Sequence, residues 1–138
     1  MLAIFLSTVL AQAPMTMTTV ARGGMSNIMD AKDVVVRTLP EWQALWREHH
    51  GADGTCPVVD FAKQMVVGVF LGARNTGGYD VEITAVERGP QGLVVRYAER
   101  TPDRGSIVAQ VITSPFHLVA VDKSDLGVTF ERAAKPGR

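Results

Sequence analysis

Cysteine is almost absent from this chain of 138 residues, and its single copy, Cys56, excludes an internal disulfide. Lys and Arg together number 14, as do Asp and Glu, so the formal net charge is zero. The charged residues are spread singly, which argues against nucleic acid and anionic membranes as partners, because both need clustered basic residues. No apolar run is long enough to cross a bilayer. We therefore expect one domain with one core and no stable membrane span.

Motifs for catalysis, cofactors and metals are also missing. No Gly-x-Ser-x-Gly elbow is present, and Gly77 is followed by Gly78 where a phosphate-binding loop needs Lys. His49 and His50 are adjacent, so they point about 100° apart on a helix and cannot easily share one ion. We expect no enzyme activity, no cofactor and no metal. Two alternatives stay open: a dispersed serine triad, and a metal site of His49, His117 and a carboxylate.

The first residues are typical of a signal peptide. A short apolar run is followed by Ala11-Gln12-Ala13, a small-residue pattern at which such peptides are cleaved. We expect segment 1–13 to be removed and 14–138 to form one exported domain, periplasmic or extracellular, with a frayed tail at 135–138. A disordered or partner-bound terminus is the alternative, since no Lys or Arg precedes the apolar run.

One helix and several short strands are expected in the rest of the chain. Thr38 and Glu41 fit a capping box, and the apolar positions that follow share one helical face: Trp42, Leu45, Trp46 and His49. The strands expected from alternation and turn residues are 15–20, 34–37, 65–71, 79–87, 93–99, 107–113, 117–122 and 127–131. This pattern predicts a mainly β, α+β domain: an antiparallel β-sandwich or partly open barrel with one amphipathic helix packed on it.

The stretch 71–80 separates an apolar run of strand length from an alternating one. Asn75, Gly77 and Gly78 tolerate positive φ, so the pattern predicts a β-hairpin with a glycine turn. Arg74 in this turn is expected to bind a partner's carboxylate or to pair with Asp60 or Asp80.

The same stretch resembles the PrcB family, named after a subunit of a bacterial surface protease complex. The residues that carry the resemblance keep the family's order over 20–132: Arg22 to Ile28, Trp42-x-x-Leu45-Trp46-x-x-His49, Val59-Asp60-Phe61, Gly72-x-Arg74-x-Thr76-Gly77-Gly78-Tyr79, Leu93 to Val95, Thr101-Pro102 and Thr113 to His117. The resemblance implies an accessory subunit that stabilises or assists a partner protease.

We therefore expect a protein-binding domain whose partner could be a protease, with the oligomeric state left open. The predicted contact residues belong to the glycine loop and the Ser26 segment: Arg74, Asn75, Thr76, Gly77, Gly78, Tyr79 and Ser26. A protease inhibitor that presents a loop and a carrier of a small apolar ligand are the alternative functions. An exposed sheet edge would favour binding by strand addition.

Overall fold

The computed structural model describes residues 13–52 and 54–133 of the chain. The predicted signal peptide, apart from Ala13, and the predicted frayed tail lie outside these residues. Export therefore stays a prediction.

The described chain consists of strands and a single helix. Its elements, in chain order, are β1 (Ala13–Pro14), β2 (Thr18–Gly23), β3 (Lys32–Val36), α1 (Leu39–His50), β4 (Gln64–Phe70), β5 (Asp80–Gly89), β6 (Gly92–Arg100), β7 (Phe116–Asp122) and β8 (Val128–Arg132). Six of the eight predicted strands are confirmed to within two residues, and so is the capped helix; the six are 34–37, 65–71, 79–87, 93–99, 117–122 and 127–131.

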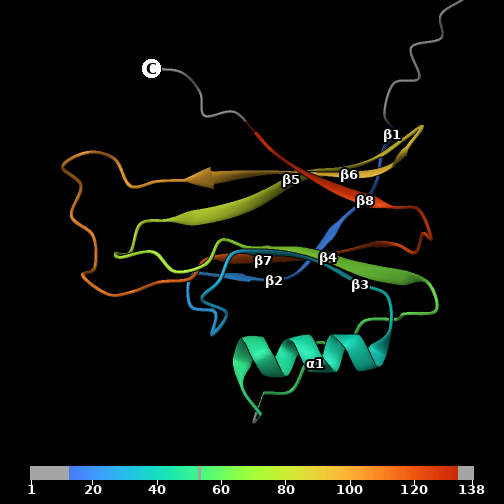
Figure 1. Ribbon diagram of the computed structural model, residues 1–138, viewed down its shortest axis with the longest axis horizontal. Coiled ribbons are helices and arrows are strands. Elements are labelled where there is room, and N and C mark those ends of the chain that lie inside the picture. The colour runs from blue at the N-terminus through green and yellow to red at the C-terminus, as the bar shows by residue number, and fades with distance from the viewer. Residues whose placement is uncertain (1–12, 53, 134–138) are drawn as a thin grey trace, which may run out of the picture.

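The strands form two four-stranded sheets that pack face to face, with the orders β1-β5-β6-β8 and β2-β7-β4-β3. Figure 1 shows three layers: the first sheet, the second sheet, and α1 on the outer face of the second. Neighbouring strands are antiparallel except β6 and β8, which are parallel. The prediction of a β-sandwich with one packed helix is confirmed.

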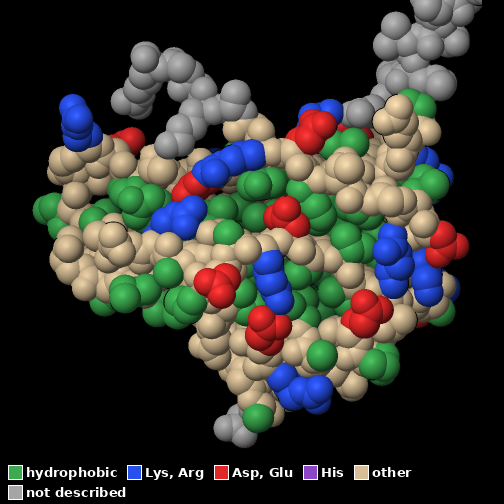
Figure 2. Space-filling model, viewed as in Figure 1, with side chains coloured by type: hydrophobic (Ala, Val, Ile, Leu, Met, Phe, Trp, Pro, Cys, Tyr) green, Lys and Arg blue, Asp and Glu red, His purple; other side chains and the backbone are tan. Residues whose placement is uncertain are grey.

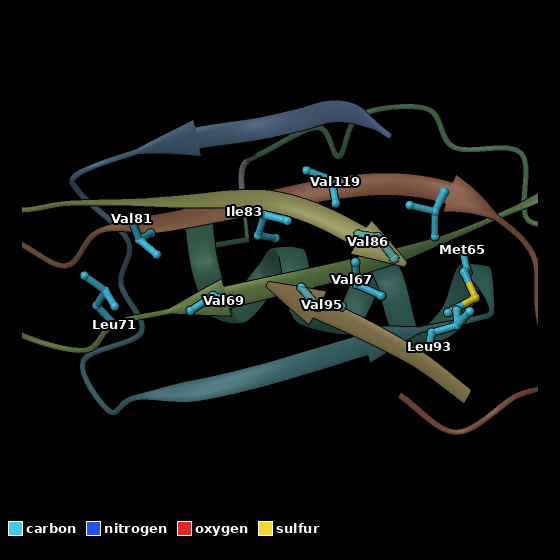
Figure 3. Close-up of a cluster of buried hydrophobic side chains, with 11 residues drawn as sticks. Met65, Val67, Val69, Leu71, Val81, Ile83, Val86, Leu93, Val95 and Val119 are labelled. Atoms are coloured by element: carbon cyan, nitrogen blue, oxygen red, sulfur yellow. The ribbon is translucent and has the colours of Figure 1, made fainter. Parts of the chain in front are cut away.

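Apolar side chains fill both spaces between the layers. Between the sheets, Met65, Val67, Val69, Val81 and Ile83 are among the buried residues, and Figure 3 shows them pointing toward one another from both sheets. The second core lies under the helix and includes Trp42, Trp46, Phe70, Phe116 and Leu118. Strand β4 is buried on both faces because alternate residues contribute to the two cores.

Helix α1 begins and ends where the sequence predicts. Thr38 accepts a hydrogen bond from the Glu41 N–H (3.3 Å), and its hydroxyl donates to the Glu41 carboxylate (2.7 Å). The helix ends at Gly51, whose φ of 97° suits glycine and whose N–H donates to the Arg47 carbonyl. The Trp42 indole donates to the Pro57 carbonyl (2.9 Å), which ties the following loop to the helix.

Three predictions about the strands are wrong. The stretch 71–79 is not a hairpin turn, because β4 and β5 belong to different sheets and the stretch crosses between them. Residues 107–113 form no strand and contribute only an isolated bridge at Thr113. The strand expected at 15–20 lies at Thr18–Gly23, because its pairing with β7 continues through Gly23.

Candidate functional site

Three connections meet at one end of the sandwich, on the left of Figure 1. Segment 24–31 links β2 to β3, segment 71–79 links β4 to β5, and segment 101–114 lies between β6 and β7. We call them together the loop platform. Backbone hydrogen bonds join them: Ser26 N–H to Ser114 O, Ser114 N–H to Gly24 O, Ala73 N–H to Met29 O, Arg74 N–H to Thr113 O, Thr113 N–H to Arg74 O, and Gly77 N–H to Ala109 O, at 2.7–3.0 Å. The structure therefore brings the two predicted contact segments together, both directly through the Ala73–Met29 bond and through the third segment.

Two glycines of the crossover allow this close approach. Gly72 has φ of 81°, and a Cβ there would lie 2.8 Å from the Ala31 nitrogen. Gly78 has φ of 89°, and a Cβ would lie 2.8 Å from both Pro102 and Val108. Asn75, Gly77 and Gly78 were expected to tolerate positive φ, and of these three only Gly78 has positive φ in the structure. Close packing of loops against one another, rather than a hairpin turn, is what requires glycine here.

The Arg74 side chain is held inside the platform. Its guanidinium pairs with the Glu99 carboxylate at 2.8 Å and donates to the carbonyls of Leu71 and Ala73, both at 3.1 Å. Its guanidinium carbon also lies 5.8 Å from the centre of the Tyr79 ring, at cation–π distance.

The predicted pairing of Arg74 with Asp60 or Asp80 is wrong. Asp80 pairs with Arg22 at 2.6 Å, and Asp60 accepts the Ala62 N–H. Glu99 of β6, whose side chain is only 7% exposed, holds Arg74 instead.

Ser26 lies beneath the platform surface and is only 2% exposed. Its hydroxyl is 2.7 Å from Nδ1 of His49 and accepts the Ile28 N–H at 3.0 Å. Burial lowers the pKa of His49, and the neighbouring His50 acts in the same direction. Sequence reasoning did not foresee this Ser–His pair. It fastens segment 24–31 to the end of α1, and its burial keeps a partner from touching Ser26 directly.

Segment 101–114 is a part of the loop platform that was not predicted from the sequence as a contact segment. Ile107 is fully exposed, Ile112 is 62% exposed, and Val111 is also exposed. Met25 and Met29 expose further apolar surface on the adjoining segment, and Figure 2 shows hydrophobic side chains at this end of the molecule. The signal was the alternation of 107–113, which predicts a strand that the folded chain does not form.

His117 lies outside the loop platform and joins the two sheets. Its Nδ1 accepts the Ile83 N–H of β5 at 2.8 Å, and its Nε2 lies 2.9 Å from the Thr19 hydroxyl of β2. Burial lowers the pKa of His117, and the Arg22 charge lowers it further. The neutral ring is the form that can accept the Ile83 N–H.

The described residues contain no group of three or more His, Cys, Asp or Glu side chains placed to hold a metal ion. Within the same residues, no helix has the length and apolar character needed to cross a membrane. Cys56, half-buried against the helix core, is a free thiol. The surface of the loop platform presents apolar side chains, loop backbone and an arginine held by Glu99.

Comparison with known proteins gives one match. The family described as PrcB C-terminal matches residues 65–122, which run from β4 through β7 and include two of the three platform segments. No curated protein and no solved structure matches the chain.

Proposed function

Because residues 65–122 carry a PrcB C-terminal-type domain, we propose that this chain is a non-enzymatic, exported domain that binds another protein. The partner we propose is an envelope protease, which the chain assists or stabilises as an accessory subunit. The family supports the accessory role. The signal-peptide pattern at 1–13 supports export to the periplasm or the extracellular space.

The observation that carries the proposal is the exposed apolar segment 107–112. Its alternating sequence predicts a strand, yet Ile107 and Ile112 point into solvent and do not join either core. Apolar side chains grouped on a loop surface are a common mark of a protein contact. The Gly77–Ala109 and Arg74–Thr113 hydrogen bonds hold this segment in place, which lowers the entropy lost when a partner binds.

The two alternative functions lead to different observations. An inhibitor would place the platform in a protease active site and abolish activity, whereas an accessory subunit leaves activity unchanged or raises it. A carrier of a small apolar ligand needs a cavity between the sheets. That space is filled by side chains such as Val67, Val86 and Val95, so the carrier function is the least supported.

Affinity purification of the tagged full-length chain from its own cell envelope tests the proposal. We expect Ile107→Asp with Ile112→Asp to lose the co-purified protein, because charge enters the apolar contact. Val58→Asp is the control, since Val58 is as exposed as Ile107 but lies in the loop after α1. Arg74→Ala and Tyr79→Ala test the predicted contact at the glycine loop. Circular dichroism of each variant separates loss of contact from loss of fold.

The proposal is wrong if the platform variants and Val58→Asp recover the same proteins in equal amounts. If the co-purified protein is a protease, its activity with and without the chain distinguishes an accessory subunit from an inhibitor.

A further inference from the structure

Segment 107–113 has the sequence of a strand, yet the single chain leaves it unpaired. It lies in the connection 101–115, which forms no helix or strand and which Figure 1 shows looping out at the left end of the sandwich. Among the described residues, the backbone N–H groups of 107–112 have no acceptor. The residues of this segment that are β-branched, and so favour strands, are Ile107, Val108, Val111, Ile112 and Thr113.

One side of the segment faces the crossover 71–79. Thr113 and Arg74 exchange two backbone hydrogen bonds, of 2.7 and 2.9 Å. The Ala109 carbonyl accepts the Gly77 N–H at 2.8 Å. Successive residues of a strand direct their N–H and C=O groups to opposite sides. If 107–113 formed a strand, its even-numbered residues would therefore direct their backbone groups away from the crossover.

The sequence around Gln110 is self-complementary. Gln110 is preceded by Val108-Ala109 and followed by Val111-Ile112. In an antiparallel pair of two copies centred on Gln110, Val108 would lie opposite Ile112 of the second copy, and the two Gln110 amides would meet on the two-fold axis. The backbone fits this register, because the residues that exchange hydrogen bonds in it are the even-numbered ones. Pairing would replace the 3.3 Å bond that the Gln110 side chain donates to the Val108 carbonyl.

Nothing in the charge of this segment opposes a second copy. No Lys, Arg, Asp or Glu occurs between Arg104 and His117. Edge strands usually carry charges that prevent pairing with other chains, as β3 does with Lys32 and Asp33. A short, uncharged, β-branched segment without proline is the kind that pairs with itself.

We propose that two copies of this chain pair antiparallel through residues 108–112, with Gln110 on the two-fold axis. The strand that the sequence predicts then forms in the dimer. Each copy contributes only a short segment, so we expect a weak dimer with a dissociation constant on the order of 100 µM. The dimer does not rest on the function proposed above. It covers the same segment as the proposed partner contact, so the dimer and that complex exclude each other.

Sedimentation equilibrium of the full-length chain, from about 10 µM to about 1 mM, tests for the dimer. Gln110→Lys places like charges opposite each other on the axis, and we expect it to weaken the dimer about tenfold or more at low salt. Gln91→Lys is the matched control, because it makes the same change at the exposed turn between β5 and β6. Its effect should stay below about twofold. Circular dichroism shows whether both variants fold.

Cysteine cross-linking tests the register in a Cys56→Ser background. Gln110→Cys places two thiols across the axis, where a hydrogen-bonded antiparallel pair brings the Cα atoms to about 5.5 Å, within disulfide range. We expect oxidised glutathione to convert this variant to a covalent dimer. Ser106→Cys is the control, because residue 106 is also exposed but would lie more than about 20 Å from its copy. It should stay largely monomeric.

Three outcomes overturn the proposal. The first is a monomer at every concentration up to about 1 mM. The second is equal weakening of the dimer by Gln110→Lys and Gln91→Lys, and the third is an equal yield of disulfide dimer from Gln110→Cys and Ser106→Cys. None of these measurements uses a partner from the cell envelope, and failure to recover a partner would not change them. The two proposals therefore fail separately.

Discussion

The two outer edges of the β2-β7-β4-β3 sheet are built differently. At the β2 edge, the register shifts between Thr19 and Ala21, and Arg22 reaches across to the other sheet. Its guanidinium pairs with Asp80 at 2.6 Å and Glu82 at 3.1 Å and donates to the Val81 carbonyl. At the β3 edge the register is continuous, and among the described residues the strand pairs with β4 alone.

This difference indicates that the β2 edge contributes mainly to stability and the β3 edge mainly to recognition. A bulge and a cross-sheet arginine make the β2 edge a poor template for another strand. The charged residues of the β3 edge are Lys32 and Asp33. Charges on an edge strand oppose pairing with another strand unless that strand is complementary in charge. We therefore expect changes at the β2 edge to alter folding and changes at the β3 edge to alter association.

The largest effect is expected at His117, which joins the sheets near the β2 edge. His117→Leu leaves the buried Ile83 N–H without its acceptor, and we expect it to lower the free energy of unfolding by about 3 kcal/mol. His50→Leu is the control, because His50 is exposed on α1, and it should cost less than about 1 kcal/mol. Urea denaturation measures both, and equal losses would show that His117 does not join the sheets in the way described.

Acidification should weaken the same region. Burial lowers the pKa of His49 and His117 in the folded chain, so the unfolded chain takes up protons first as the pH falls. Stability is then fully present above the unfolded value of about 6.5 and declines below it. Urea denaturation from pH 8 to pH 5 measures the decline, which His117→Leu should make shallower. A stability that rises over this interval contradicts the described burial of the two rings.

Arg22 and Lys32 are cations at the two edges, and the stability losses of their alanine variants can be compared. Arg22→Ala loses two partly exposed ion pairs and the bond to the Val81 carbonyl, and we expect a loss of about 1 kcal/mol. Lys32→Ala loses one exposed pair with Glu48 and should cost about 0.3 kcal/mol. Thermal unfolding at low and high salt measures both changes. A larger loss at Lys32 would reverse the assignment of the two edges.

The smallest change in stability is expected at Asp33, where association should change instead. Asp33→Val removes a partly buried charge from the β3 edge, and we expect a shift in unfolding free energy of about 0.5 kcal/mol or less. Self-association should increase, because the edge loses the charge that opposes unselective pairing. Sedimentation velocity over a concentration series measures it. Unchanged sedimentation would mean that the β3 edge does not pair with strands.

The sequence predicts the elements of this fold better than their pairing. The capping box at Thr38 and the apolar face that includes Trp42 are local signals, and the structure has both. Pairing depends on residues far apart in the chain, so the run 65–70 predicts a strand without showing that its partners are β3 and β7. The hairpin prediction failed at this step, since a glycine-rich stretch serves a crossover as well as a turn.

The candidate site shows the same limit. The sequence drew attention to Arg74 and Ser26, and the structure places both segments in one platform. The sequence could not show that Glu99 holds Arg74 or that His49 covers Ser26, because these contacts join separate elements. The exposure of 107–112 was missed because apolar residues in a sequence do not show whether they pack in a core or contact a partner.

Hydrogen–deuterium exchange of the chain, alone and in complex with the protein that co-purifies with it, tests most directly whether this molecule acts by contact. We expect slower exchange in the complex at 72–79 and 101–112, with β2 unchanged. Protection confined to β2, or unchanged exchange throughout the platform while the partner is bound, would contradict it.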